Sequence, residues 1–418
     1  MYREQQLKAL LQDRRILIAG YGREGRSAES LIRRLVPEAQ YTIADGNEQI
    51  AAEAAKDYDL IIKSPGVPMR VMGGAECSSL TDLFLQVYGD MTIGITGTKG
   101  KSITASLIHH LLPGSILAGN IGIPLFDILD QLHEGSIVVA ELSCHQLEVL
   151  HRSPHISVLL NLFQEHLDHY DDYLGYKMAK LQIALHQHPE DHFFYCTDNE
   201  ELRSMVEDGG LRFDGLLHPY SLNNMSADES GLIDACPLLG KHNRSNALVA
   251  CRVATLAVSA PSPLRPLLAT FHGLRHRLEL VGTYRGVTFY NDSISTIPAA
   301  TLAALNSLPG VETLILGGFD RGIDYGPIIS LLVSPPMGLK NVAFVGDVGR
   351  RILETMNGIP NRINILQEND YDKIVRWCYR VTSLGKICLL SPAAASYDSF
   401  KNFEERGDTF IKLVKKYA

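Results

Sequence analysis

The sequence contains no Cys-x-x-Cys pair, no long apolar run and no excess of basic residues. Its seven cysteines are scattered and odd in number, which indicates reduced, mostly buried thiols in a cytosolic protein. No apolar stretch reaches the roughly 18–20 residues that a membrane helix needs. The polar segment Met1–Gln6 lacks the apolar part of a signal peptide. We therefore expect a cytoplasmic protein that does not enter a membrane.

The net charge of −8 argues against a general nucleic-acid binder, because a phosphate backbone is held by a basic surface. A local basic pocket for a small anion stays possible. Hydrophobic residues make up 45% of the 418 residues and charged residues 21%, which is typical of a soluble folded protein. A chain of this length is expected to form two to four domains of roughly 100–200 residues each.

Short β-branched runs alternate with amphipathic stretches along the chain, without an internal repeat. This pattern predicts an α/β fold in which mostly parallel sheets are covered by helices. Breaks near Tyr88–Asp90 and Phe271–Gly273 divide the chain into three expected domains, residues 1–88, 89–273 and 274–418. The expected strands are Ile16–Ala19, Tyr41–Ala44, Leu60–Ile62, Thr92–Thr96, Ile137–Ala140, Ile156–Leu160, Thr288–Tyr290, Thr313–Leu316, Val342–Val345 and Ile387–Leu390.

The clearest motif is a glycine loop, Gly97–Ser102, that follows the expected strand Thr92–Thr96 and precedes a helix with an apolar face. Strand, glycine loop and helix together form the arrangement that a phosphate-binding loop requires. Backbone N–H groups and the helix N-terminus would hold the anion, Lys101 would add a full charge, and the Ser102 hydroxyl would bind Mg²⁺. The general pattern has a glycine where Ile95 stands. The loop is therefore a compact variant, or else a plain strand-to-helix turn.

Acidic and imidazole side chains follow the next expected strands. Glu141 ends a buried strand, where a carboxylate either holds Mg²⁺ or caps the following helix. His166, Asp168 and His169 lie within four residues after another strand, a spacing that also permits zinc. The neighbouring phosphate loop favours Mg²⁺ for this cluster. Further on, Tyr176–Lys180 is compatible with a solvated basic helix face.

A second glycine motif, Gly20–Gly25, has the spacing G-x-G-x-x-G between an expected strand and helix. With Asp45 at the end of the next strand, it looks like a dinucleotide-binding fold for NAD or another nucleotide diphosphate. A tight turn without a ligand is the alternative. In the last third, three polar loops each follow an apolar strand and are expected at the ligand edge of a sheet: Asn291–Ser293, Gly317–Gly322 and Ser391–Ser396.

The motifs form an ordered set along nearly the whole chain: Gly97–Ser102, Asn120–Gly122, Glu141–Ser143, Asn161 with His166–Asp168, Tyr176–Lys180, His242–Asn246, Phe271–Arg277, and Leu390–Ser396 with Phe400–Gly407. Together they resemble the Mur ligase family of ATP-dependent peptidoglycan-precursor ligases. The resemblance implies three domains: an N-terminal Rossmann-like domain that binds UDP, a central ATPase domain with a mostly parallel sheet, and a C-terminal Rossmann-like domain that binds an amino acid.

The resemblance implies that ATP phosphorylates the carboxylate of UDP-N-acetylmuramoyl-L-alanine and that the amine of D-glutamate then attacks the acyl phosphate. Phosphorylation would supply the leaving group that a carboxylate lacks, while the protein positions the reactants and neutralises charge. The resemblance makes Lys101, Glu141, His166 and Lys180 the catalytic residues. Ser102, Glu141 and His166 would hold Mg²⁺, with two metal sites expected. Lys180 matches a lysine that the family carbamylates with CO₂, which would create a further metal-binding carboxylate.

The resemblance also implies binding residues, motif by motif. ATP is expected at Gly97, Thr98, Lys99, Gly100, Lys101, Ser102, Ile103, Asn243, Asn246, Arg277 and Asp292. The UDP-linked substrate is expected at Gly22, Arg23, Glu24, Asp45, Gly46, Ser64, Pro65, Asn120, Ser143 and Gln146, so the first glycine motif would hold UDP and not NAD. D-Glutamate is expected at Thr296, Arg321, Ser396, Tyr397 and Phe403.

Three departures from the family pattern concern the amino-acid pocket more than the ATP site. Ile294 stands where close relatives often have lysine, Arg321 replaces a common lysine with a different reach, and Glu165 replaces an aspartate beside His166. The alternatives are a related ligase that adds another amino acid or extends a folate-like substrate, a non-catalytic protein that binds the UDP-linked precursor, and an NAD-linked oxidoreductase. We expect a monomer whose partners are small molecules.

Overall fold

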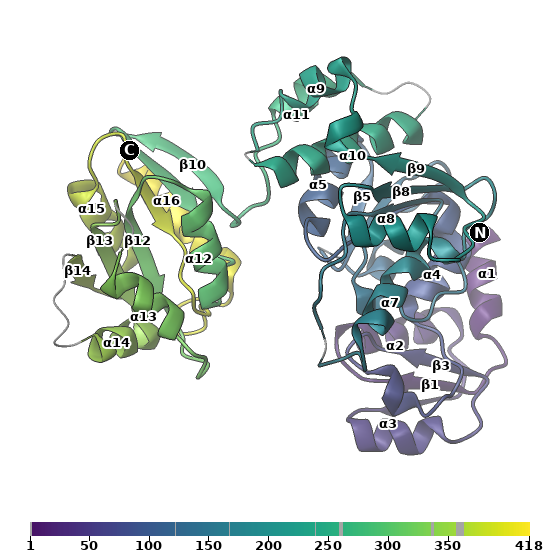
Figure 1. The fold of residues 1–418 in the computed structure, drawn as a ribbon. Coiled ribbons are helices and arrows are strands. Elements are labelled where there is room, and N and C mark those ends of the chain that lie inside the picture. Colours follow the sequence, from purple (N-terminus) through teal and green to yellow (C-terminus); the bar gives the residue numbers. More distant parts are fainter. Residues whose placement is uncertain are drawn as a thin grey trace. The chain divides into compact units, whose positions relative to one another are not determined.

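The structure is a computed structural model, and it describes residues 2–121, 123–166, 168–238, 240–258, 262–335, 338–356 and 363–418. Gly122 and Leu167, which belong to two of the motifs above, lie outside the described residues. The chain divides into two compact units, residues 1–271 and 272–418 (Figure 1). The expected further division of the first unit near residue 88 stays a prediction.

The first unit begins with a small parallel sheet. Its elements are α1 (Tyr2–Leu11), β1 (Ile16–Ala19), α2 (Arg23–Leu35), β2 (Tyr41–Ala44), α3 (Asn47–Ala54), β3 (Leu60–Lys63), the 3-10 helix η1 (Met69–Met72) and α4 (Leu80–Tyr88). The strand order is β2-β1-β3, and all four residues of β1 are apolar and buried. Because the strands are parallel, the residues that follow Ala19, Ala44 and Lys63 emerge at one edge of the sheet.

A six-stranded sheet forms the larger part of the first unit. Its strands are β4 (Thr92–Thr96), β5 (Ile116–Gly119), β6 (Val138–Glu141), β7 (Ile156–Leu159), β8 (His192–Cys196) and β9 (Leu216–Tyr220), in the order β5-β6-β4-β7-β8-β9. All strand pairs run parallel. The helices are α5 (Lys101–Leu111), α6 (Cys144–Leu147), α7 (Tyr173–Leu185), α8 (Glu200–Glu207), α9 (Ala227–Ile233), α10 (Lys241–Ala257) and α11 (Leu264–Ala269), with 3-10 turns η2 (Gly89–Met91), η3 (Leu125–Gln131) and η4 (Leu222–Asn224).

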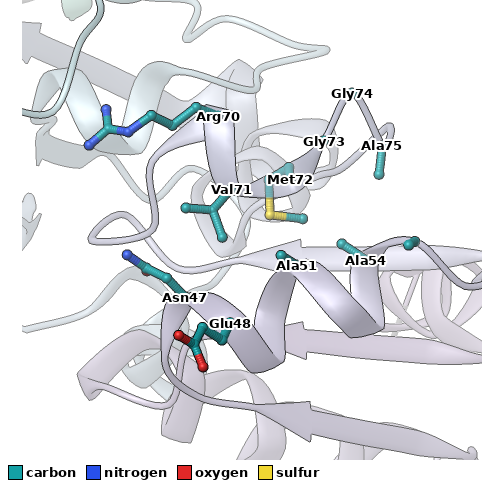
Figure 2. A pocket seen from close by; sticks show the side chains of 11 residues that line it. Asn47, Glu48, Ala51, Ala54, Arg70, Val71, Met72, Gly73, Gly74 and Ala75 are labelled. Carbon is teal, nitrogen blue, oxygen red and sulfur yellow. The ribbon is translucent and has the colours of Figure 1, made fainter.

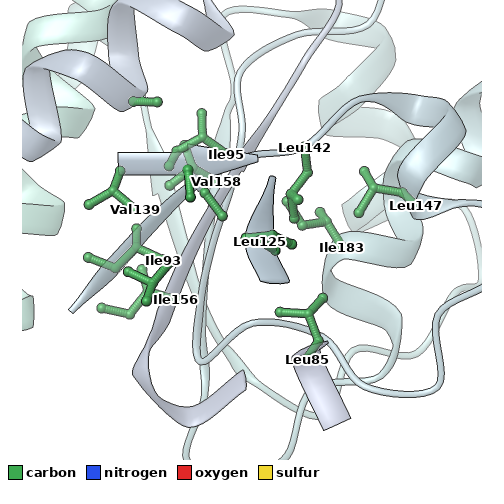
Figure 3. Close-up of a cluster of buried hydrophobic side chains, with 14 of the residues drawn as sticks. Leu85, Ile93, Ile95, Leu125, Val139, Leu142, Leu147, Ile156, Val158 and Ile183 are labelled. Atoms are coloured by element: carbon green, nitrogen blue, oxygen red, sulfur yellow. The ribbon is translucent and has the colours of Figure 1, made fainter. Parts of the chain in front are cut away.

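The central strands of this sheet are buried on both faces, as expected for parallel strands covered by helices. Figure 3 shows Ile95, Val139 and Val158, from three adjacent strands, in one apolar cluster. The same cluster extends from Leu7 in α1 to Phe271 and contains residues of both sheets. Continuous apolar packing therefore joins the two sheets within one unit.

The second unit contains another six-stranded sheet. Its elements are β10 (Glu279–Tyr284), β11 (Val287–Asn291), α12 (Pro298–Ser307), β12 (Val311–Gly317), α13 (Gly326–Val333), β13 (Asn341–Val345), α14 (Gly346–Thr355), β14 (Asn364–Gln367), α15 (Tyr371–Val381), β15 (Ile387–Leu390) and α16 (Phe403–Lys416). The order is β10-β11-β15-β12-β13-β14, and only the pair β10–β11 is antiparallel among the described strands. Residues of α12, α13 and α14 share one apolar cluster, and those of α15 and α16 share another.

The sheets confirm the expected α/β class with mostly parallel strands. All ten expected strands form, and their bounds differ from the expected ones by at most two residues. Five further strands, β5, β8, β9, β10 and β14, were not expected. Within the described residues, no helix combines the length and the apolar character required to cross a membrane.

Candidate functional site

The phosphate loop, Gly97–Ser102, leaves the C-terminal end of β4 and enters α5. Gly97 has a φ of +153° and Gly100 a φ of +88°, which residues with a side chain rarely adopt. A Cβ atom on Gly97 would lie 2.9 Å from the Cβ of Leu160, and one on Gly100 would lie 3.0 Å from Oδ1 of Asn246 in α10. Both glycines are therefore required by conformation and by close contact.

Hydrogen bonds from more distant residues hold the loop in this shape. The Lys99 backbone N–H donates to Oδ1 of Asn161 over 2.8 Å, and Nδ2 of Asn161 donates to the Lys99 carbonyl over 3.0 Å. The hydroxyl groups of Thr98 and Tyr176 share a 2.7 Å hydrogen bond. The Lys99 ammonium forms an ion pair with Glu165, one of the residues that depart from the family pattern.

Two lysine side chains converge on the start of the loop. Nζ of Lys101 donates to the carbonyls of Gly97 and Thr98 at 2.9 and 3.1 Å. Nζ of Lys180, which is 1% exposed, donates to the same Gly97 carbonyl at 2.9 Å and lies 4.9 Å from the centre of the Tyr176 ring. Burial lowers the pKa of both lysines, to about 8 for Lys180, and the nearby Lys101 charge adds to that shift. Lys180 therefore does not lie on a solvated basic face.

Glu141 ends β6 at the strand position paired with Ile95, beside the phosphate loop. Its side chain is buried, and Oε1 accepts a 2.7 Å hydrogen bond from Nδ2 of Asn120. Oε2 is also buried and has no hydrogen-bond partner within the described part of the chain. A buried carboxylate oxygen without a donor is costly in the absence of a cation, so Glu141 fits the expected metal ligand.

The histidine-rich segment after β7 is arranged differently from a compact ligand cluster. His166 has a φ of +58°, and its ring centre lies 4.8 Å from that of His145. Nε2 of His169 lies 2.7 Å from Oε1 of Glu148, while Asp168 is exposed. Burial, with the His169 and His166 charges, lowers the pKa of His145 to about 3. Among the residues that the structure describes, no three His, Cys, Asp or Glu side chains are grouped to hold a metal.

Comparison with known proteins agrees with this geometry. The model of the Mur ligase middle domain matches residues 95–254, which include the phosphate loop, Glu141 and Lys180. A UDP-N-acetylmuramoylalanine–D-glutamate ligase of Symbiobacterium thermophilum is 32% identical over 416 residues, covering 93% of this chain and 91% of the relative. The chain belongs to the Mur ligase family.

Two further Mur ligases extend this comparison. A UDP-N-acetylmuramoyl-L-alanine–L-glutamate ligase of Salinispora tropica is 31% identical over 455 residues, covering 98% of this chain and 99% of the relative. The crystal structure of the MurF ligase from Thermotoga maritima in complex with ADP has a TM-score of 0.54 and 18% identity, covering 96% of this chain and 95% of that one. The structural similarity supports the Mur ligase fold.

The C-terminal edge of the first sheet of this Mur ligase brings together several residues expected to bind the UDP-linked substrate. The Tyr21 backbone N–H donates to Oδ1 of Asp45 over 3.1 Å, and the Ser64 hydroxyl donates to the Gly20 carbonyl over 2.7 Å. Gly20 has a φ of +92°, and a Cβ atom on Gly25 would lie only 2.1 Å from the Gly20 carbonyl oxygen. The conformation of Gly20 and the close contact at Gly25 explain the first and last glycines of the G-x-G-x-x-G motif. Gly22, Gly46 and Pro65 follow the same strand ends.

Contacts also connect this edge with the six-stranded sheet. Nε2 of Gln146 donates to Oε1 of Glu24 over 2.8 Å, and Arg23 donates to the Gly119 carbonyl over 3.4 Å. Burial raises the pKa of Glu24, whose Oε2 is buried without a hydrogen-bond partner among the described residues. Gln146 also forms the capping box of α6 with Ser143. The structure thus places Arg23, Glu24, Ser143 and Gln146 in one region.

A cavity of about 650 Å³ adjoins the first sheet, between α3 and the segment that contains η1 (Figure 2). The side chain of Arg70 forms part of its lining, and its guanidinium contacts the histidine-rich segment. The cavity is lined by Asn47, Glu48, Ala51, Ala54, Ala55, Arg70, Val71, Met72, Gly73, Gly74 and Ala75.

Residues expected to bind D-glutamate lie in the second unit. Arg321 donates to the Thr296 carbonyl over 2.8 Å, which brings two of them together. The Phe403 carbonyl accepts a 2.8 Å hydrogen bond from the Ser293 hydroxyl. Ser396 is buried, whereas Tyr397 is exposed. Two residues expected at ATP, Arg277 and Asp292, also belong to this unit, while Asn243 and Asn246 lie in α10 of the first unit.

Three residues that shape these sites had no assigned role in the sequence interpretation. Asn161 and Tyr176 were part of recognised motifs, but their bonds to the phosphate loop could not be read from spacing. Arg406 is 1% exposed, and its guanidinium donates to the carbonyls of Ser293, Ala394 and Ala395. The sequence signal for Arg406 was its place in the segment Phe400–Gly407, which belongs to the motifs that resemble the family. Arg406 fixes two loops that carry expected ligand-binding residues.

Proposed function

We propose that this Mur ligase joins D-glutamate to UDP-N-acetylmuramoyl-L-alanine with cleavage of ATP to ADP and phosphate, in peptidoglycan-precursor synthesis. The observation that carries the proposal is the grouping of Lys101, Lys180 and Glu141 around the phosphate loop, where Oε2 of Glu141 has no hydrogen-bond partner among the described residues. The name of the 32% identical relative supports the choice of substrates. The residues expected at ATP, UDP and D-glutamate remain assignments of this proposal.

The proposed reaction has two steps. A carboxylate oxygen of the alanyl group attacks the γ-phosphorus of ATP, and the bond to the ADP oxygen breaks. The amine of D-glutamate then attacks the acyl carbon, phosphate leaves, and the nitrogen loses a proton. Lys101 stabilises the negative charge on the transferred phosphoryl group, because a buried cation acts most strongly where water is excluded.

The donor set fits a magnesium site. Glu141, Ser102 and His166 would hold Mg²⁺, and a carbamate on Lys180 would provide a carboxylate for a second ion. The metal would supply charge that neutralises the phosphate oxygens. The lowered pKa of Lys180, about 8, increases the fraction of neutral amine, which is the form that combines with CO₂. Its burial would protect the adduct from water.

The other binding assignments are divided between the units. In the first unit, Gly22, Arg23, Glu24, Asp45, Gly46, Ser64 and Pro65 would hold the UDP part, with Asn120, Ser143 and Gln146 at the sugar and alanyl arm. In the second unit, Thr296, Arg321, Ser396, Tyr397 and Phe403 would hold D-glutamate. We further propose that the protein works in the cytoplasm as a monomer, with no nucleic-acid or membrane partner.

L-Glutamate is a second candidate amino acid, because the 31% identical Salinispora tropica relative is named an L-glutamate ligase. The test is phosphate release from ATP with UDP-N-acetylmuramoyl-L-alanine and each amino acid in turn. We expect phosphate release only when both substrates are present, and we expect D-glutamate to be the preferred amino acid. Preference for L-glutamate would select the second candidate. Equal turnover with L-lysine or L-alanine would contradict both.

A further inference from the structure

A buried ion pair links the first sheet to the six-stranded part of the same unit. Nζ of Lys63, the last residue of β3, lies 2.6 Å from Oε2 of Glu148, just after α6. Their side chains are 0% and 4% exposed. The other carboxylate oxygen, Oε1, lies 2.7 Å from Nε2 of His169. Lys63 also donates to the Val67 carbonyl over 2.8 Å. One carboxylate thus binds both the strand that leads to Ser64 and the histidine-rich segment.

A second contact between the same two segments does not involve this ion pair. Arg70, in η1, donates to the His169 carbonyl over 2.6 Å and to the Asp168 carbonyl over 3.2 Å. Because both acceptors are backbone carbonyls, the Arg70 guanidinium holds the main chain of the histidine-rich segment directly. Arg70 is about half exposed, with a side-chain exposure of 48%.

The two segments joined in this way carry residues proposed for different ligands. Ser64 and Pro65, proposed for the UDP part, follow Lys63 directly, and Arg70 is five residues further on. On the other side, His166 precedes His169 by three residues. The His145 ring contacts both, with centre-to-centre distances of 4.8 and 4.3 Å. These contacts therefore connect the segment after β3 with the segment that carries His166.

Building on the proposed function, we propose that Lys63, Arg70, Glu148 and His169 are positioning residues that couple binding of the UDP-linked precursor to binding of the magnesium–nucleotide. A buried ion pair holds its partners in one geometry, because separating either charge from the other inside the protein is costly. Binding of the precursor at the end of β3 would favour that geometry. The segment that carries His166 would then be held in the geometry that the magnesium–nucleotide requires.

The coupling is measured by titrating the full-length protein with a non-hydrolysable ATP analogue and Mg²⁺, with and without UDP-N-acetylmuramoyl-L-alanine. Wild-type protein is expected to bind the analogue about fivefold or more tightly when the precursor is present, at the lower end of known coupling strengths. Arg70→Met and Glu148→Gln should bring this ratio close to one. The ratio compares two affinities of the same variant, so a general loss of stability does not by itself remove the coupling.

Arg33→Met is the matched control, because Arg33 is an exposed arginine of the first sheet region whose carboxylate partner, Glu29, is on its own helix. It should keep the wild-type ratio. If Glu148→Gln does not fold, the exposed residue Arg70 still decides the question. A wild-type ratio of one, or an unchanged ratio in Arg70→Met, would overturn the coupling while leaving the proposed reaction intact. Failure of wild-type protein to bind the precursor would overturn both, and a different amino-acid preference would affect only the proposed reaction.

Discussion

The side chains of Lys101 and Lys180 donate to the same acceptor, the carbonyl oxygen of Gly97, each over 2.9 Å. Two ammonium groups that share one acceptor repel each other, and both are largely removed from water. Such a pair is stabilised by an anion at the loop or by conversion of one amine to a neutral or negative group. The geometry therefore connects the phosphate loop with the proposed modification of Lys180.

Replacing Lys180 with alanine is expected to lower turnover by at least about 10²–10³-fold, the loss typical of removing one strong electrostatic contact to a transition state. Acetate or formate should restore part of the activity, because either supplies the carboxylate that a carbamate would provide. Phosphate release measures both effects. Lys177→Ala is the control, because Lys177 lies on the same helix but pairs with Glu201. Full activity of Lys180→Ala would contradict the proposed carbamate.

Glu141→Gln is expected to raise the Mg²⁺ concentration needed for half-maximal activity. Glutamine keeps an oxygen that can accept from Asn120 but removes the negative charge of the carboxylate. The loss should be partly overcome by high Mg²⁺, which a titration of the initial rate measures. Glu134→Gln, at an exposed glutamate, should leave the Mg²⁺ dependence unchanged. An unchanged dependence in Glu141→Gln would remove Glu141 from the metal site.

The fold was predictable where the strands are apolar and buried on both faces, since such runs have few other stable conformations. The missed strand β9 reads Leu-Leu-His-Pro-Tyr, and Pro219 lacks the N–H that a central strand requires. Its place at the edge of the sheet makes the proline tolerable. Strand β10 was hidden by Gly282, which has a φ of +142° and lies at an irregularity in the register.

The phosphate loop was predictable because its chemistry depends on neighbours in sequence. The contacts around it were not, since Thr98 and Tyr176 are 78 positions apart and neither is unusual on its own. The closely spaced trio His166, Asp168 and His169 shows the opposite problem. The turn at His166 leads the three side chains to different surroundings, and within the described residues their nearness in sequence is not matched by a three-ligand group.

Gly25→Ala is expected to destabilise the first sheet by about 1–3 kcal/mol, the usual cost of overfilling a packed site. The new Cβ would lie 2.1 Å from the Gly20 carbonyl oxygen, a backbone atom that cannot rotate away as the end of a flexible side chain could. Urea denaturation measures the free energy of unfolding. Gly22→Ala is the matched control for stability, because a Cβ atom there would meet no atom within 4 Å. Equal stability of the two variants would show that α2 can move away from β1.

Asp191 provides a test of stability against pH. Burial alone would raise its pKa, but hydrogen bonds from His155, Arg152 and the His188 backbone outweigh that effect and lower the pKa to about 2. Since an unfolded aspartate has a pKa of about 3.9, the folded protein gains stability from this carboxylate above pH 4 and loses it as the pH falls from 4 towards 2.

Asp191→Asn should therefore lower the free energy of unfolding at pH 7 by about 1.5–3 kcal/mol, the range for hydrogen bonds to a charged group. The difference between variant and wild type should shrink as the pH is lowered below 4, because protonation then removes the same charge from the wild-type protein. Urea denaturation at several pH values measures this difference. Asp214→Asn, at an exposed aspartate paired with Arg212, should show no comparable effect. A difference that stays constant down to pH 3 would mean that the Asp191 carboxylate is not stabilised by these donors.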